Sequence, residues 1–165
     1  METRWEDRAE ALLSEPYAVI DSLPMQVPAD SAGQYFAVER WMQQPQQKEP
    51  LFRKLAAILL RLNCYFDFRV CRDCSGEWES NPDPETLANW FVACANAEQP
   101  GSHRLLVLLD SQNALFAVDG DDAYMVLYHP SEQLLRLTEQ ISTAEGLFVW
   151  RHGNGAEQET IEHTS

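Results

Sequence analysis

Residues 114–150 read ALFAVDGDDAYMVLYHPSEQLLRLTEQISTAEGLFVW and contain a hairpin, a helix and a strand. Asp119 and Gly120 begin a turn between two β-prone runs, because these residue types tolerate the positive φ of tight hairpin loops. Side chains alternate along a strand, so one face of the hairpin carries Phe116, Val118, Ala123, Met125 and Leu127. The other face carries Leu115, Ala117, Tyr124, Val126 and Tyr128. Both faces are apolar, so we expect the hairpin to lie in the centre of its sheet.

The helix and the strand follow the hairpin directly. We expect Pro130 at the first helical position and Glu132 in the first turn, where the helix dipole favours a carboxylate. Apolar residues then recur at helical spacing, and Gly146 is the expected left-handed stop. Residues 147–150 are too short and apolar for anything but a strand. The whole unit predicts an α+β fold with a mostly antiparallel sheet and helices packed on one face.

Similar patterns predict the elements that precede this unit. We expect helices at residues 2–14, 34–44, 51–63 and from Pro84 onward, and strands at residues 17–20, 65–71 and 77–79. The second helix has an apolar side of Tyr35, Phe36, Val38, Trp41 and Met42. Residues 105–109 fit either a strand or a helical turn, because periodicity does not decide so short a run.

The length and composition of the chain predict one folded domain. A chain of 165 residues with 45% hydrophobic residues can bury a core without disulfides or metals. We expect a single α+β domain over residues 1–152. The residues after it, 153–165, lack an apolar pattern and are expected to form a disordered tail.

The net charge of −14 limits the classes of partner. A surface this acidic repels phosphates and anionic membranes, so we expect no direct binding to nucleic acid or membrane. The first seven residues lack the basic and apolar regions of a signal peptide, and the longest apolar runs are too short to span a bilayer. We therefore expect a cytoplasmic protein, whose acidity serves solubility or, alternatively, a basic partner.

The four cysteines are Cys64, Cys71, Cys74 and Cys94. The Cys71/Cys74 spacing suits a zinc knuckle, but the second close pair of a structural zinc site is missing. A redox pair would be expected at a helix N-terminus, whereas this pair lies in a predicted hairpin turn. Thiols without a catalytic role are the favoured interpretation, and a dyad of Cys74 with His103 stays open.

The acidic turn offers an alternative metal site. Asp119, Asp121 and Asp122 are the closely spaced carboxylates that Mg²⁺ or Ca²⁺ requires. The turn lacks the ligand count and the terminal Glu of a calcium loop, so a solvated hairpin turn is favoured. We expect no cofactor.

A third candidate site is the polar side of the strand expected at residues 65–71. Tyr65, Asp67 and Arg69 would lie on one face of this strand and could line a binding groove beside Trp78. An ordinary cross-strand ion-pair face explains the same residues.

Several stretches resemble a group of small uncharacterised bacterial proteins with no assigned function. They lie at residues 17–24, 33–40, 81–85 and 144–150, and the likeness covers most of residues 16–150. The resemblance implies a bacterial cytoplasmic protein and transfers no site.

Charge and the lack of catalytic motifs favour a non-enzymatic protein-binding module with a basic partner, immunity- or antitoxin-like. The competing hypothesis is a metal- or cysteine-dependent enzyme that uses the Asp119–Asp122 loop or Cys71 and Cys74. Substrate and oligomeric state do not follow from the sequence.

Overall fold

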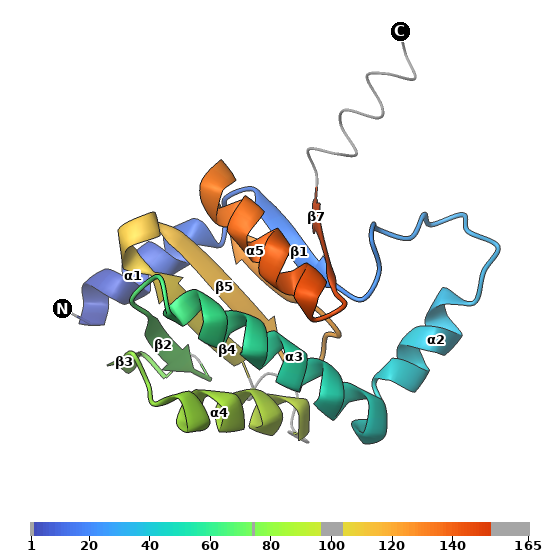
Figure 1. The fold of residues 1–165 in the computed structure, drawn as a ribbon, viewed down its shortest axis with the longest axis horizontal. Helices are drawn as coiled ribbons and strands as arrows, with labels where there is room; N and C mark the ends of the chain where they lie inside the picture. The colour runs from blue at the N-terminus through green and yellow to red at the C-terminus, as the bar shows by residue number, and fades with distance from the viewer. Residues whose placement is uncertain (1, 74, 97–103, 153–165) are drawn as a thin grey trace, which may run out of the picture.

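The fold is known from a computed structural model, which describes residues 2–73, 75–96 and 104–152 (Figure 1). The described helices are α1 (Glu2–Leu12), α2 (Tyr35–Met42), α3 (Pro45–Asn63), α4 (Pro84–Asn96) and α5 (Glu132–Ala144). The strands are β1 (Tyr17–Asp21), β2 (Arg69–Arg72), β3 (Trp78–Ser80), β4 (Arg104–Leu109), β5 (Ala114–Asp119), β6 (Met125–Tyr128) and β7 (Phe148–Arg151). The predicted α+β class is confirmed.

The seven strands in the described part of the chain belong to one antiparallel sheet in the order β3-β2-β4-β5-β6-β1-β7. The hairpin of β5 and β6 lies at the centre, as its two apolar faces predicted. Phe116 pairs with Leu127 and both point into one core, whereas Leu115 belongs to the core on the other face. The ambiguous run at residues 105–109 is a strand, because it pairs with β2 and β5.

Three helices, α3, α4 and α5, pack against one face of the sheet (Figure 1). Phe52 and Leu55 of α3, Phe91 of α4 and Phe116 of β5 are fully buried between these layers. On the other face, α1 packs on β4 and β5, and its Ala9 and Leu12 join the second core. Helix α1 covers only this part of the sheet, so it leaves the same face uncovered over β6, β1 and β7.

Two helix starts differ from the prediction. Helix α3 begins at Pro45, six residues earlier than expected, with Pro45 at an N-terminal position that tolerates proline. Pro50 lies inside this helix, where the burial of Leu51 and Phe52 next to it offsets the lost hydrogen bond. In α5 the N-cap is Ser131, so Pro130 precedes the cap instead of opening the helix.

The strand expected from residue 65 begins only at Arg69. Asn81 holds the preceding segment in a turn, since its side chain accepts a hydrogen bond from Phe68 N at 2.8 Å and donates one to Asp67 at 3.0 Å. The expected tail, residues 153–165, lies outside the described residues.

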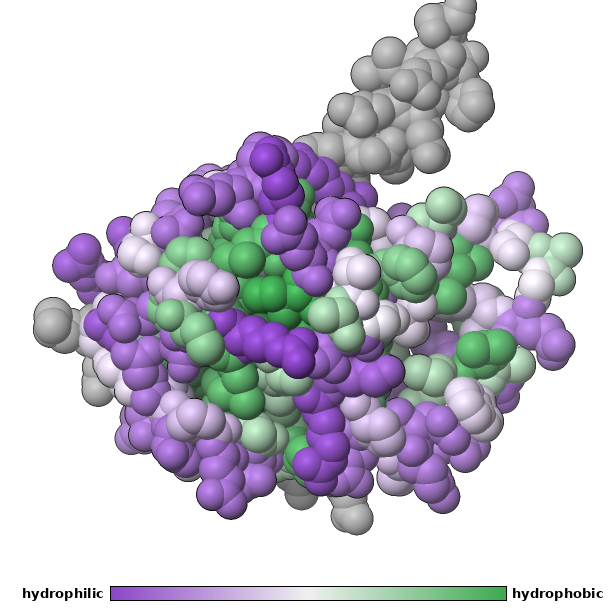
Figure 2. Space-filling model, viewed as in Figure 1, coloured by the Kyte–Doolittle hydropathy of each residue, from purple (hydrophilic) through white to green (hydrophobic). Residues whose placement is uncertain are grey.

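Helix α2 stands apart from the layers at the end of a long loop (Figure 1). None of its residues is buried, and most of its apolar side is in solvent: Phe36 is 77% exposed, Val38 56% and Trp41 50%, whereas Met42 packs against the main core. Hydrophobic residues accordingly reach the surface on the side of the molecule where α2 lies (Figure 2). None of the helices in the described part of the chain combines the length and apolar character needed to cross a bilayer.

Candidate functional site

Aromatic side chains form rows across the sheet face opposite α3, α4 and α5. Strand β1 lies between β6 and β7, so Tyr17 is opposite Tyr128 on one side, and His152 N donates to Tyr17 O at 3.1 Å on the other. Two residues along, Val19 is opposite Val126 and Trp150. The first row of this surface is therefore aromatic throughout, and the second consists of two valines and Trp150.

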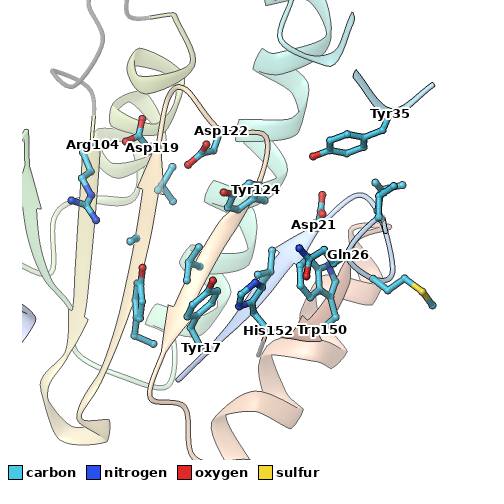
Figure 3. Close-up of a pocket in the computed structure, with 18 residues that line it drawn as sticks. Tyr17, Asp21, Gln26, Tyr35, Arg104, Asp119, Asp122, Tyr124, Trp150 and His152 are labelled. Carbon is cyan, nitrogen blue, oxygen red and sulfur yellow. The ribbon is translucent and has the colours of Figure 1, made fainter. Parts of the chain in front are cut away.

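This surface is the base of a cavity of about 420 Å³ (Figure 3). Tyr124 and Asp122 from the end of the β5–β6 hairpin line one side of the cavity, and Trp150 of β7 lines the other. The loop after β1 adds a rim of Leu23, Met25, Gln26 and Val27. A volume of this size fits a small ligand or a few side chains of a protein partner.

The rings along the first row contact one another. Tyr17 and His152 stack with centroids 4.8 Å apart and an interplanar angle of 8°, and Tyr17 meets Tyr128 at 5.4 Å and 54°. Burial, with a smaller contribution from Tyr128, raises the pKa of Tyr17. These contacts fix the rings in place, so the cavity wall is largely formed before any ligand binds.

A second cavity, of about 300 Å³, lies between α2 and the β5–β6 turn. The two cavities share five lining residues: Asp21, Leu23, Tyr35, Asp122 and Tyr124. We call this set the junction. It combines two carboxylates, two phenol rings and one aliphatic side chain, drawn from β1, the following loop, α2 and the end of the hairpin.

Both carboxyl groups at the junction are held in an unfavourable environment for negative charge. Burial raises the pKa of Asp21, against hydrogen bonds from Ser22, whose backbone N donates to Oδ1 at 2.7 Å, and from Leu23. The indole N–H of Trp150 also acts to lower this pKa, although the buried Nε1 makes no hydrogen bond of normal geometry. Burial, and then the charges of Asp119 and its neighbours, raise the pKa of Asp122.

The pKa values of both junction tyrosines are raised, in part by nearby carboxylates. A hydrogen bond with Glu39, followed by burial and the charge of Asp21, raises the pKa of Tyr35 to about 12. Burial and then the charge of Asp122 raise the pKa of Tyr124 to about 12. Both phenols therefore stay neutral at physiological pH and can accept hydrogen bonds through their oxygens.

The acidic turn is a hairpin turn that is held by one hydrogen bond between its own residues and one from Gln43. Asp121 N donates to Asp119 Oδ1 at 2.9 Å, and Gln43 Nε2 ties the turn to the end of α2 through Asp121 O at 3.1 Å. Burial lowers the pKa of Lys48 in α3, whereas the three turn carboxylates act in the opposite direction. Among the residues that the structure describes, no group of three or more His, Cys, Asp or Glu is placed to hold a metal ion.

The four residues of the groove predicted around Tyr65 lie in two separate places. Arg69 and Trp78 point to the α1 side, where the Arg69 guanidinium lies 5.0 Å from the centroid of the Trp5 ring and Trp78 is buried. Tyr65 is 66% exposed in the turn after α3, and Asp67 binds Asn81. The binding role of these four residues stays a prediction.

The cysteines of the described residues lie in separate environments. Cys64 is exposed at the end of α3, and Cys71 is buried on the α1 side of the sheet. Cys94 is buried on the opposite side, where burial raises its thiol pKa to about 12. Cys74 and His103, the other members of the cysteine hypotheses, lie outside the described residues.

Sequence reasoning did not predict the cavity. The sequence does contain one signal, because strand alternation places Tyr124, Val126 and Tyr128 on one face of the hairpin, and this face lines the cavity. Comparison with known proteins found no family model that matches this chain and no similar curated protein or solved structure.

Proposed function

We propose that the chain is a non-enzymatic binding module that captures a basic protein partner, with an immunity- or antitoxin-like role in the bacterial cytoplasm. The observation that carries the proposal is the junction, where the partly buried carboxyls of Asp21 and Asp122 adjoin an aromatic cavity. The docking surface consists of the rim of the two cavities together with the exposed side chains of Leu23, Met25, Phe36, Val38 and Trp41.

Charge complementarity favours a basic occupant of this surface. The net charge of −14 attracts a cationic protein over a distance, and the carboxylates of the cavities specify where it docks. Asp21 and Asp122 both have raised pKa values, so a positive group placed beside them would relieve an existing electrostatic cost. An anionic partner would increase that cost.

Helix α2 supplies the apolar part of the docking surface. Phe36 and Trp41 are large side chains with no covering layer, and tyrosine, tryptophan, phenylalanine and methionine are enriched in protein interfaces. Isolated exposed apolar residues are common on proteins, but here one short helix exposes Tyr35, Phe36, Val38 and Trp41, of which Tyr35 and Val38 line the smaller cavity. Their burial by a partner would add affinity to the electrostatic attraction.

Affinity capture from bacterial lysate, followed by reconstitution with the purified partner, tests this function. We expect a basic protein to bind and the affinity to fall as salt is raised. Paired substitutions Phe36→Ser and Trp41→Ser should abolish most binding without unfolding the chain, since both side chains are exposed.

The matched control is Tyr65→Ser, which removes another exposed aromatic ring outside the docking surface. It should leave binding unchanged. The proposal fails if no partner is recovered at low and physiological salt, or if the recovered partner is insensitive to the α2 substitutions. Loss of binding in Tyr65→Ser alone would place the interface at the turn after α3, where Tyr65 lies.

A further inference from the structure

We propose that the junction of the two cavities binds an alkylammonium group, supplied either by a lysine side chain of the partner or by a free amine. For the lysine source, the inference rests on the proposed function. The ammonium would lie beside Tyr124, on which the charges of both Asp21 and Asp122 act, with its alkyl chain along Val19 and Val126.

The placement of the junction side chains matches this chemistry. In Figure 3 the Asp21 carboxylate lies near the Tyr35 hydroxyl, and the Asp122 carboxylate lies near Tyr124. The two carboxylates therefore reach the shared space from different segments, each accompanied by a neutral phenol. An ammonium group has three N–H donors that point in different directions, so it can bond to one of these carboxylates and to the phenol oxygen beside it, while the second carboxylate attracts it from a longer distance.

Aromatic and aliphatic surfaces complete the fit. Tyr124, Tyr35 and the more distant Trp150 present rings to the cavities, and a cation over such a ring is attracted by its negative face. Leu23 and the row of Val19 and Val126 offer apolar contact for methylene groups. A hydrophobic stem that ends in one positive charge satisfies both kinds of surface.

The charges around the junction favour an external cation. Of the described residues that line the two cavities, Arg104 alone carries a permanent positive charge, and it lies at the far end beside Asp119 (Figure 3). Lys48 acts on Asp122 from α3, yet the pKa of Asp122 remains raised. Burial is the first cause of this raised pKa, and the charges of Asp119, Asp121 and Glu39 each act more strongly on Asp122 than Lys48 does, so the charges around Asp122 sum to a negative field.

An ammonium fits better than a guanidinium or an anion. A guanidinium is a planar fork that is best met by a single carboxylate in two parallel hydrogen bonds. The junction instead places one carboxylate next to a phenol on each of two segments, so the acceptors at either position are not two parallel carboxylate oxygens alone (Figure 3). An anion would meet two carboxylates and is excluded.

Titration by NMR with four small probes tests the inference on the full chain. The probes are n-butylammonium, N-acetyl-lysine-methylamide, N-acetyl-arginine-methylamide and N-acetyl-norleucine-methylamide. We expect saturable shifts of the Asp21, Asp122 and Tyr124 amides and of the Trp150 indole N–H with at least one ammonium probe. A dissociation constant on the order of 1 mM is expected for so small a ligand.

Comparison of the probes identifies the source of the amine, and comparison of variants locates the site. Tighter binding of the lysine derivative points to a protein lysine, and equal or tighter binding of n-butylammonium points to a free amine. Asp21→Asn and Asp122→Asn should both weaken binding, by about tenfold for the carboxylate that bonds to the ammonium and by less for the one that acts through its charge alone. The matched control Asp7→Asn removes an exposed carboxylate from α1 and should leave the affinity unchanged.

Several outcomes would overturn the inference. These are no binding of either ammonium probe, equal binding of the norleucine derivative, tighter binding of the arginine derivative, or an equal loss of affinity in Asp7→Asn. If a basic partner is still captured through α2 while the ammonium probes fail, the inference falls and the proposed function stands. If n-butylammonium binds but no partner is captured, the proposed function falls and the amine site stands.

Discussion

Tyr17 and His152 stack with their ring planes 8° apart and their centroids separated by 4.8 Å. The stack joins β1 to the end of β7, the last strand of the sheet, and His152 N also donates to Tyr17 O. The same two side chains line the larger cavity. One contact therefore holds the edge of the sheet and shapes the candidate site.

Replacing the ring of His152 should loosen this edge. His152→Ala removes the stack, and we expect unfolding free energy to fall by about 0.5–1.5 kcal/mol, the typical strength of an aromatic pair. Amide exchange of β7 should accelerate more than that of β5, because β5 lies at the centre of the sheet. Unchanged exchange in β7, measured by NMR, would show that the stack does not hold the strand.

Removing the charge of Asp122 should stabilise the protein at neutral pH. The folded-state pKa of this carboxyl is raised above its ordinary value of 3.8, so the folded state binds its proton more tightly than the unfolded state does. The free energy of unfolding therefore falls as the pH rises from the unfolded-state pKa to the folded-state pKa of Asp122. Above the folded-state pKa the full cost of the charged form is present. Asp122→Asn should abolish this cost.

Thermal denaturation at about pH 7 and about pH 4 checks the sign. The gain in Tm of Asp122→Asn over the wild type should be clear at the higher pH and should shrink towards zero as the wild-type carboxyl becomes protonated. Asp7→Asn is the control and should show no such trend. A gain that is independent of pH would mean that packing, and not charge, is responsible.

Local patterns predicted the centre of the fold because the required information lies close together in the chain. The Asp119–Gly120 turn and the two-residue period of the flanking runs place Phe116 and Leu127 on the same face, whereas their direct pairing depends on the loop length, which the pattern does not fix. Gly146 likewise adopts the predicted left-handed conformation, with φ of 78°. Each of these features depends on fewer than about twenty neighbouring residues.

The candidate site could not be predicted in this way. Tyr17, Tyr124 and Trp150 meet only because β1 inserts between β6 and β7, a pairing that joins residues more than one hundred positions apart. Helix α2 shows a different limit, since its amphipathic pattern correctly indicates a helix but does not tell what covers the apolar side. The sequence therefore predicts the elements better than the surface between them.

The two phenylalanines Phe116 and Phe36 should respond oppositely to the same substitution. Phe116 is fully buried in the centre of the sheet, so Phe116→Ala should cost about 3–5 kcal/mol of unfolding free energy. Phe36 is 77% exposed on α2, and Phe36→Ala should change stability by less than about 0.5 kcal/mol. Chemical denaturation measures both. A large loss for Phe36→Ala would mean that α2 packs on the body of the protein and is not free to dock.

The start of α5 offers a comparison between two neighbouring residues. Ser131 is the N-cap, and its Oγ accepts a hydrogen bond from Leu134 N at 3.1 Å, whereas Pro130 lies outside the helix. Ser131→Ala should lower the unfolding free energy by about 1 kcal/mol, because the backbone N–H of the first turn loses its acceptor. Pro130→Ala should cost less, since proline at this position contributes only stiffness in the unfolded chain. If denaturation curves show the larger loss for Pro130→Ala, the helix begins at proline, as the sequence pattern alone suggested, and Ser131 is not its cap.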